Sequence, residues 1–300
     1  MFMERSRPRL RRMELKRERF MHTDSQAVPQ FHNRTRKSDS IPRTLLRRGR
    51  LLDVLHYYLL RTSDLAREGL ENSGSYRFAD HIYRNVPSGT NAVGRWIDAR
   101  LLAMPSVQSF RSRFLAARDE LARFLCQHSG AALDVLSVPC GIPRELAEGA
   151  ALARQQCADV SRVVFHGLDL DRELLGYAQV FACEYGIDNF QTHHGDALSR
   201  SSYPAHADFV TSTGLADFLD DEKLLELYSR VHQVLRPGGT FVSSGMQRRK
   251  AAEYLLKIAE IRAHYRGHEK LEALARAAGF QDVTTRYDAL SIQCILVAKK

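Results

Sequence analysis

The sequence predicts an α/β fold with a seven-stranded, mostly parallel sheet, an antiparallel last strand and a preceding helical cap. After Gly130, short β-rich runs alternate with amphipathic helical segments, which is typical of parallel strands joined by helical crossovers. The last two runs are separated only by Asp288–Ser291, a gap that suits an antiparallel hairpin. Before Gly130, apolar residues recur at three-to-four spacing, which predicts helices.

Three parts follow along the chain. Residues 1–43 mix Arg, Ser, Pro and Gln with few periodic apolar positions, so we expect a mostly disordered basic tail. Residues 44–127 are expected to form a helical cap or lid, with helices over Thr44–Leu70, Arg95–Met104 and Ser106–Gln127 and a loop over Asn85–Gly94. Residues 128–300 are expected to form the α/β domain.

The α/β domain is predicted to contain seven strands and three connecting helices. The strands are expected at Leu133–Val138, Val163–Leu168, Phe190–His194, Phe209–Ser212, Thr240–Ser244, Asp282–Tyr287 and Ile292–Ala298. The helices between the first five strands are expected at Arg144–Ala158, Arg172–Tyr185 and Glu222–Leu235.

Composition narrows the class of protein. The chain is 44% hydrophobic and 26% charged, with no apolar run long enough for a bilayer, so we expect no membrane span. Its five cysteines are scattered and never form a C-x-x-C pair, which predicts neither a disulfide framework nor a metal site. These features favour a reducing, cytoplasmic compartment.

The net charge of +9 belongs to the tail. Residues 1–50 hold 15 Lys/Arg and 5 Asp/Glu, leaving 29 and 30 for the rest of the chain. A basic tail can bind nucleic acid through phosphate contacts, but charge runs are more often solvated extensions, which is the interpretation we favour.

The first strand of the domain ends in a tight loop, Ser137-Val138-Pro139-Cys140-Gly141-Ile142-Pro143. It lacks the G-x-G-x-x-G pattern of a dinucleotide site, and its prolines remove amide donors that a pyrophosphate would need. Gly141 nevertheless allows a ligand to approach the backbone closely, and a purely structural turn is the alternative.

Acidic residues follow the next two strands. Asp169 stands where a carboxylate commonly accepts the hydroxyls of an adenosine ribose, whereas Asp171 is expected to cap the following helix. Asp196 with Ala197 follows the third strand and could contact an adenine, with an ordinary turn acid as the alternative.

Taken together, these strand ends resemble the Rossmann-like class I S-adenosylmethionine-dependent methyltransferases, and so do Ala207–Leu215 and Leu235-Arg236-Pro237-Gly238-Gly239. The resemblance implies S-adenosylmethionine as the cofactor and a cofactor site made of Ser137, Pro139, Cys140, Gly141, Asp169, Leu170, Asp196, Ala197, Thr213 and Gly214. The chain departs from the family in the first loop, where an acid and several glycines are usual but Ser137, Pro139 and Pro143 stand here.

The upstream segment from Asp80 to Arg113 more faintly resembles the helical cap of methyltransferases that are sometimes fused to hydrolases. In such caps a tyrosine often reaches the cofactor, which makes Tyr83 a candidate. A half-buried packing tyrosine is the alternative.

An activated sulfonium methyl requires mainly alignment of the acceptor and exclusion of water, so no catalytic residue is assigned from sequence. A hydroxyl acceptor would benefit from a base, and the candidates are His81, His193, His194 and His232, each of which could equally be a packing or surface residue. We expect methyl transfer to an O or N atom of a small molecule. The alternatives are an RNA or protein methyltransferase anchored by the tail, a non-catalytic binding protein of the same fold and, more remotely, a dinucleotide oxidoreductase.

Overall fold

The predicted seven-stranded sheet is confirmed in a computed structural model that describes residues 40–72, 75–248 and 263–300. Its strands are β1 (Leu133–Ser137), β2 (Val163–Asp169), β3 (Phe190–His194), β4 (Ala207–Ser212), β5 (Leu235–Met246), β6 (Asp282–Tyr287) and β7 (Gln293–Lys299). They are ordered β3-β2-β1-β4-β5-β7-β6. β7 runs antiparallel to both of its neighbours, β5 and β6, as the short gap before it predicts.

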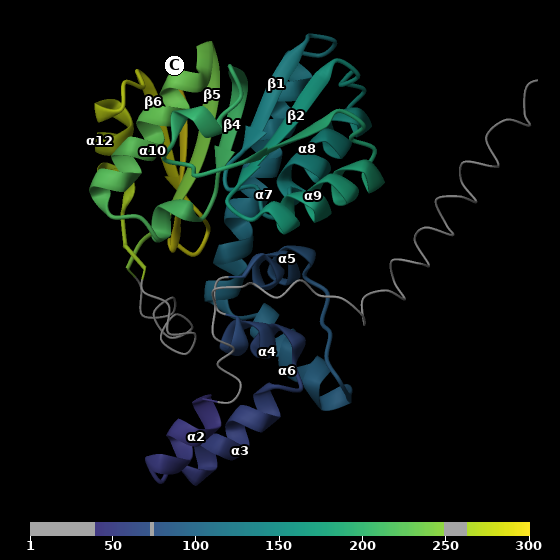
Figure 1. Ribbon diagram of the computed structural model, residues 1–300, viewed down its shortest axis with the longest axis vertical. Helices are drawn as coiled ribbons and strands as arrows, with labels where there is room; N and C mark the ends of the chain where they lie inside the picture. The colour runs from purple at the N-terminus through teal and green to yellow at the C-terminus, as the bar shows by residue number, and fades with distance from the viewer. Residues whose placement is uncertain (1–39, 73–74, 249–262) are drawn as a thin grey trace, which may run out of the picture. The chain divides into compact units, whose positions relative to one another are not determined.

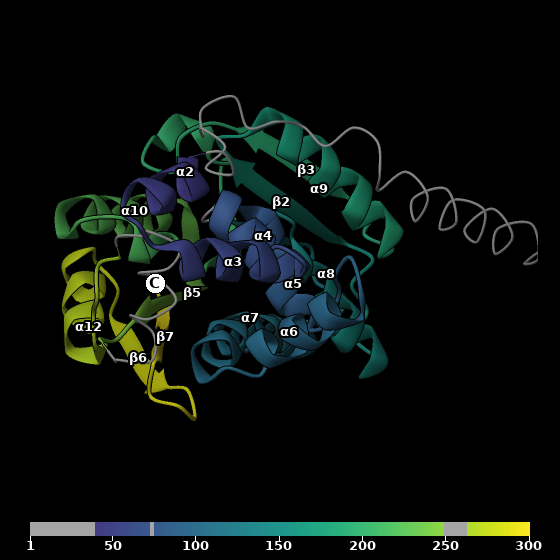
Figure 2. The same cartoon turned by 90° about the horizontal axis from the view of Figure 1, so that it is seen from below.

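Helices cover both faces of the sheet (Figures 1 and 2). On one face lie α7 (Pro105–Gln127), α8 (Arg144–Gln155) and α9 (Arg172–Glu184). On the other lie α10 (Asp221–Val234) and α12 (His268–Ala277). The 3-10 turn η1 (Arg200–Ser202) lies between β3 and β4, and the 3-10 turn η2 (Leu215–Asp217) lies between β4 and α10. Helix α12, which follows the undescribed residues 249–262, was not predicted from the sequence.

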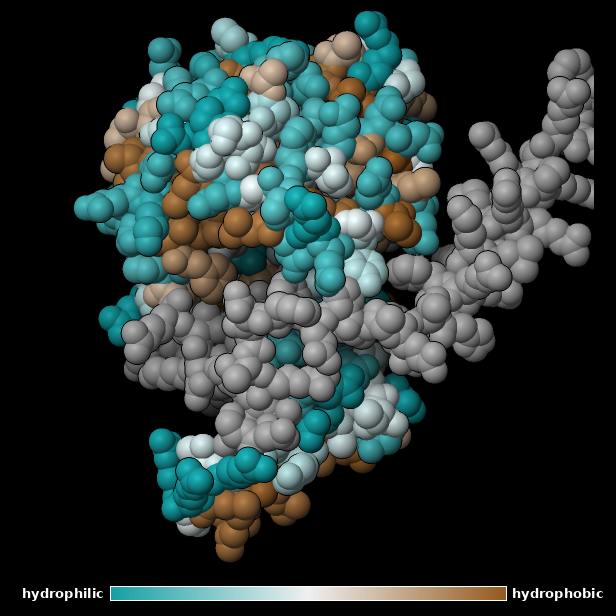
Figure 3. Space-filling view, in the orientation of Figure 1, coloured by the Kyte–Doolittle hydropathy of each residue, from teal (hydrophilic) through white to brown (hydrophobic). Residues whose placement is uncertain are grey.

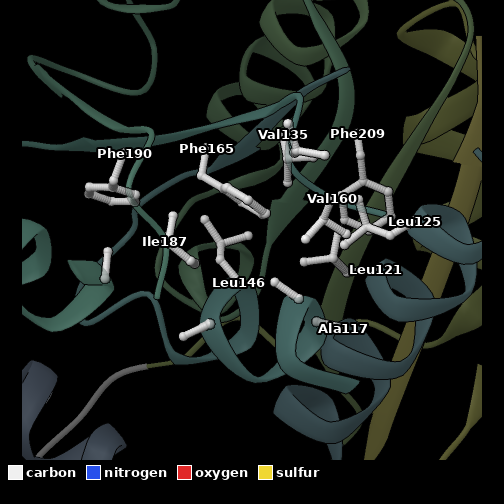
Figure 4. Packing of buried hydrophobic residues seen from close by; sticks show 14 of the residues in the cluster. Ala117, Leu121, Leu125, Val135, Leu146, Val160, Phe165, Ile187, Phe190 and Phe209 are labelled. Atoms are coloured by element: carbon white, nitrogen blue, oxygen red, sulfur yellow. The ribbon is translucent and has the colours of Figure 1, made fainter. Parts of the chain in front are cut away.

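Alternation along the strands divides the core into two layers. Val135, Phe165 and Phe209 point toward α7 and α8, as Figure 4 shows for the first layer. Their strand neighbours Leu136 and Val210 point toward α10 and α12. Each fully buried side chain of this size contributes about 1.5–3 kcal/mol, so the two layers hold the strand ends rigidly in register.

The described residues before α7 form five short helices: α2 (Ser40–Arg47), α3 (Leu51–Leu60), α4 (Asp64–Glu71), α5 (Tyr76–Arg84) and α6 (Ala92–Leu102). The single helix expected over Thr44–Leu70 is therefore wrong. The chain breaks at Gly49, which has a φ of +67°, and at Ser63, whose hydroxyl caps α4 by accepting from the amide of Ala66. Disorder was expected for residues 1–43. Residues 1–39 lie outside the described residues, whereas residues 40–43 belong to α2.

A buried carboxylate joins the middle helices. Asp98 on α6 is fully buried and accepts hydrogen bonds from Ser63 Oγ at 2.6 Å and His81 Nε2 at 2.7 Å. Burial acts to raise the pKa of Asp98, but the hydrogen bonds from His81, Ser63 and two backbone amides outweigh it and lower the pKa. This hub holds α4, α5 and α6 together.

The first two helices present apolar side chains to solvent, visible as brown surface over α2 and α3 in Figure 3. The exposed residues are Leu46, Leu51, Leu52, Leu55, Tyr58 and Leu59. In the described ranges, no helix combines the length and the apolar character that crossing a bilayer requires.

Candidate functional site

The carboxyl ends of β1, β2 and β3 are joined by hydrogen bonds centred on Asp169. The amide of Gly141 donates to Asp169 Oδ2 at 3.0 Å, and the amide of Asp171 donates to Oδ1 at 3.1 Å. The amide of Gly195 donates to the carbonyl of Asp169 at 3.0 Å. Three sequence-predicted segments, the Gly141 loop, Asp169 and the Gly195-Asp196 turn, therefore meet at one rim of the sheet.

Asp169 is partly withdrawn from water at this rim. Burial raises its pKa, although the amides of Gly141 and Asp171 oppose the shift. Asp171 caps α9 as predicted, because its side chain accepts from the amides of Glu173 and Leu174. Leu170 between them is exposed. The Asp169 carboxylate is thus fixed by the backbone, in a position to accept hydrogen bonds from a bound group.

Asp196 shapes the turn after β3. Its Oδ1 accepts from the amide of Leu198 at 2.9 Å, which is the turn role considered as the alternative. The carbonyl of Ala197 accepts from the hydroxyl of Tyr203 at 2.6 Å, and Tyr203 is buried. These contacts fix the shape of the turn, and the bond from the Gly195 amide keeps the turn beside Asp169.

The loop after β1 has an exposed and a buried part. Pro139 is exposed, whereas Cys140 packs so tightly on β2 that a Cβ on Gly167 would lie 2.9 Å from its sulfur. Burial raises the pKa of the Cys140 thiol well above its usual value, so this thiol stays neutral and serves packing. Gly141 has a φ of +51°, which favours glycine.

A buried carboxyl group lies behind this loop and was not predicted. Ser137 Oγ donates to Glu145 Oε1 at 2.5 Å, and Glu145 in the first turn of α8 is only 7% exposed. Burial raises the pKa of Glu145 to about 7 despite the hydrogen bond from Ser137. The signal in the sequence was an acid in the first turn of this helix, eight residues after the serine.

Helix α5 lies against the first loop. The Cβ of Tyr76 is 3.8 Å from where a Cβ on Gly141 would be. Asp80 on the same helix pairs with Arg144 at the start of α8, with an Nη2–Oδ1 distance of 2.7 Å. Tyr83, the tyrosine chosen from sequence, instead stacks on Phe114 with ring centroids 4.6 Å apart. Tyr76 is therefore the cap tyrosine that contacts the loop.

The end of β4 is covered by α7. Gly214 has a φ of +100°, and a Cβ there would lie 2.7 Å from Arg113 Nη2. Arg113 is buried, donates to Asp217 Oδ2 at 3.1 Å and lies 3.6 Å from the ring centroid of Phe110. Thr213 beside Gly214 is half-buried. Only glycine fits at position 214 while Arg113 keeps this position.

The interface between α7 and the sheet changes from apolar to polar toward the same rim. Along α7, Ala117 and Leu121 belong to the core, whereas Arg113 and Ser109, one and two turns earlier on the same face, are polar and buried. On the facing strands β4, β5 and β7, the buried residues that point toward α7 are also polar near this rim. Within the described part of the chain, five buried atoms there lack a hydrogen-bond partner: Ser109 Oγ, Arg113 Nε, Thr211 Oγ1, Ser244 Oγ and Gln293 Oε1.

The family described as a methyltransferase domain matches residues 144–239. The chain contains a methyltransferase domain with the class I fold.

Solved structures share the fold of this methyltransferase domain. A "possible exported protein" from Bordetella parapertussis has a TM-score of 0.68 and 24% identity, covering 86% of this chain and 92% of that one. Magnesium protoporphyrin IX methyltransferase from Synechocystis, solved with bound S-adenosylhomocysteine (SAH), has a TM-score of 0.50 and 17% identity, covering 74% and 93%. An O-methyltransferase family protein from Burkholderia thailandensis has a TM-score of 0.51 and 14% identity, covering 75% and 67%. No curated protein matches.

Two of the four candidate histidines, His81 and His232, make contacts away from the rim. His81 is bonded to Asp98 within the cap, and His232 packs edge-on against Phe280 with centroids 5.1 Å apart. Neither contact involves the rim around Asp169.

Two of the candidates lie on β3. His193 Nε2 is 3.0 Å from His166 Nδ1, and burial lowers the pKa of His193. His194 Nε2 donates to the carbonyl of Leu170 at 3.2 Å. None of the four histidines makes a hydrogen bond to Gly141, Asp169 or Gly214, so the structure gives no support for a histidine base.

The Leu235–Gly239 motif lies at the opposite end of the methyltransferase sheet. Arg236 pairs with Asp208 on β4 and Asp134 on β1. The amide of Gly238 donates to the carbonyl of Lys300 at 2.9 Å. The segment is part of β5, which begins at Leu235 and not at Thr240 as expected from the sequence.

Proposed function

We propose that the chain transfers a methyl group from S-adenosylmethionine to an oxygen or nitrogen atom of a polar small molecule. The observation that carries this proposal is the rim at which Gly141, Asp169 and Asp196 meet. When bound, the cofactor supplies an activated sulfonium methyl. All other steps would be binding, orientation and exclusion of water by this chain.

The donor set at the rim fits this cofactor. Asp169 would accept from the ribose hydroxyls, while Leu170, Asp196 and Ala197 would line the adenine. The loop with Ser137, Pro139, Cys140 and Gly141 would face the methionine part. Carboxyl groups at Asp169 and Glu145 flank this loop and suit a cationic ligand, whereas Pro139 and Pro143 remove donors that a pyrophosphate would need.

We place the acceptor between α7 and the rim, beside Thr213 and Gly214. The five partnerless polar atoms under α7 support this location, because each such atom costs about 1–3 kcal/mol unless water or a ligand satisfies it. Likeness to the O-methyltransferase family protein favours an oxygen acceptor. Tyr76 or Tyr83 of the cap would contact the cofactor, and the contact of Tyr76 with the first loop favours Tyr76.

The alternative of an RNA or protein methyltransferase depends on residues 1–39, which lie outside the described residues. Deleting residues 1–39 tests it. Our proposal predicts that methyl transfer to the acceptor and its salt dependence survive the deletion.

The proposal itself is tested by incubating the full chain with labelled methyl donor and fractionated metabolites. Mass spectrometry of the products should show a small molecule heavier by one methyl group, and Gly214→Ala should abolish its formation. Transfer to RNA or protein alone would contradict the proposal.

A further inference from the structure

Glu145 is a buried acid without a cationic partner. Its side chain is 7% exposed, and the only side-chain hydrogen bond to its carboxyl group in the described structure comes from Ser137 Oγ at 2.5 Å. No described lysine, arginine or histidine forms an ion pair with it. A buried carboxyl group in this situation is costly to ionise, and a cation placed beside it would remove that cost.

The nearest arginine in sequence is held elsewhere. The guanidinium group of Arg144 pairs with Asp80 at 2.7 Å, donates to the hydroxyl of Tyr185 at 3.0 Å and lies 4.9 Å from the ring centroid of Phe181. The Arg144 guanidinium group is therefore bound by residues of α5 and by residues of α9 and its C-terminal end. Arg144 therefore lowers the pKa of Glu145 only through space, and that pKa still rises to about 7 because of burial.

Glu145 is hydrogen-bonded to Ser137, the residue from which the first loop starts. Ser137 is the last residue of β1, and its hydroxyl donates to an acid supplied by α8. The acidic group at the end of β1 therefore comes from the helix that follows the loop.

We propose that the Glu145 carboxylate binds the α-ammonium group of the methionine part of the cofactor, with Ser137 orienting it. This inference depends on the proposed function, because it assumes that the methionine part lies over the Gly141 loop. The ammonium group would supply the cation that the buried carboxyl group lacks.

The charged residues around the proposed ammonium position favour a cationic ligand. Glu145 from α8 and Asp169 from β2 both act to raise the pKa of the Cys140 thiol between them. Glu148, one turn along α8, adds a further negative charge that raises the pKa of Glu145, and Arg144 is the one cation that opposes it among the causes of the shift. Binding of an ammonium group would lower the pKa of Glu145 and release a proton between pH 6 and 7.

Two ligands separate this contact from the rest of the site. SAH carries the ammonium group, whereas 5′-methylthioadenosine keeps the adenosine and sulfur but lacks the amino-acid part. Calorimetric titration of the full chain should show that Glu145→Gln weakens binding of SAH about 10-fold to 100-fold, the usual effect of losing a charged hydrogen-bond acceptor. Binding of 5′-methylthioadenosine should change less than 2-fold.

Glu184→Gln is the matched control, since it removes an exposed carboxylate from the end of the neighbouring helix α9. It should leave both affinities within about 2-fold. Titrations of SAH at pH 6.5 in buffers of different ionisation enthalpy should show proton release for the unaltered chain and Glu184→Gln but not for Glu145→Gln.

The possible failures are distinguishable. Unchanged SAH affinity in Glu145→Gln, or equal losses for both ligands, would overturn this inference while leaving the proposed function standing. If the unaltered chain binds neither ligand at millimolar concentration, the proposed function itself is wrong. Melting temperatures of the variants identify any loss that comes from unfolding.

Discussion

Arg144 and Asp80 form an ion pair with an Nη2–Oδ1 distance of 2.7 Å that ties the first turn of α8 to helix α5. The guanidinium side chain is 7% exposed and the carboxylate 18%. Since α8 begins directly after the Gly141 loop, this pair fixes the helix that covers the loop. Helix α5 is therefore attached to the helix that follows the Gly141 loop.

Asp80→Asn should loosen that attachment. The variant leaves the Arg144 guanidinium partly unpaired, so the free energy of unfolding should fall by about 1–3 kcal/mol. Hydrogen exchange of the α5 amides should become at least about 10-fold faster. Glu226→Gln, which breaks the exposed pair with Arg230, should change stability by less than about 1 kcal/mol. Equal effects of the two variants would show that the Asp80 pair is no more than a surface contact.

Asp169→Ala should weaken binding of SAH by about 1.5–3 kcal/mol, the usual cost of losing a charged hydrogen-bond acceptor. Calorimetry measures the change. Asp188→Ala, at an exposed position before β3, should have no effect. Unchanged affinity in Asp169→Ala would remove Asp169 from the ribose site.

Glu145 should make stability depend on pH. Its pKa is about 7 in the folded chain against a reference value of 4.5, so the folded state binds the proton more tightly. The associated stability is fully present below about pH 4.5 and is lost as the pH rises through 7, by up to about 3 kcal/mol. Glu145→Gln should remove this dependence and make the chain more stable above pH 7. Parallel urea-unfolding curves for the two proteins from pH 4.5 to 8 would contradict the assignment.

Gly214→Ala should destabilise the chain by about 1–3 kcal/mol, since φ is +100° and the new methyl group would displace Arg113. Gly238→Ala is the matched control, with a φ of +81° and no atom within 4 Å of the added Cβ. It should cost only the backbone strain, about 1 kcal/mol. Urea unfolding measures both changes, and a cost for Gly214→Ala no larger than that for Gly238→Ala would exclude the Arg113 contact.

The sheet could be predicted because its strands carry a local signal. Alternating apolar residues and the short Asp288–Ser291 gap indicate strand positions and the hairpin without reference to distant residues. The helix breaks at Gly49 and Ser63 were missed because apolar periodicity continues across them. The breaks come from a positive φ and a hydroxyl cap, which periodicity does not report.

The meeting of Gly141, Asp169 and the Gly195-Asp196 turn at one rim was predictable, because these residues directly follow strands of a parallel sheet. Glu145 and Arg113 were not, because their importance depends on contacts that only folding creates. Arg113 meets Asp217 across 104 positions of sequence. From the sequence alone, Ser137 indicates only that the acid of the resembling family is absent. Its partner Glu145 on α8 becomes evident only in the structure.

The most direct test of the account is a crystal structure of the full chain with SAH. The account predicts that both ribose hydroxyls donate to Asp169, that the adenine lies beside Asp196 and Ala197, and that the methionine part crosses the Gly141 loop. A nucleoside bound at another edge of the sheet, or a ribose beyond hydrogen-bond distance of Asp169, would contradict it.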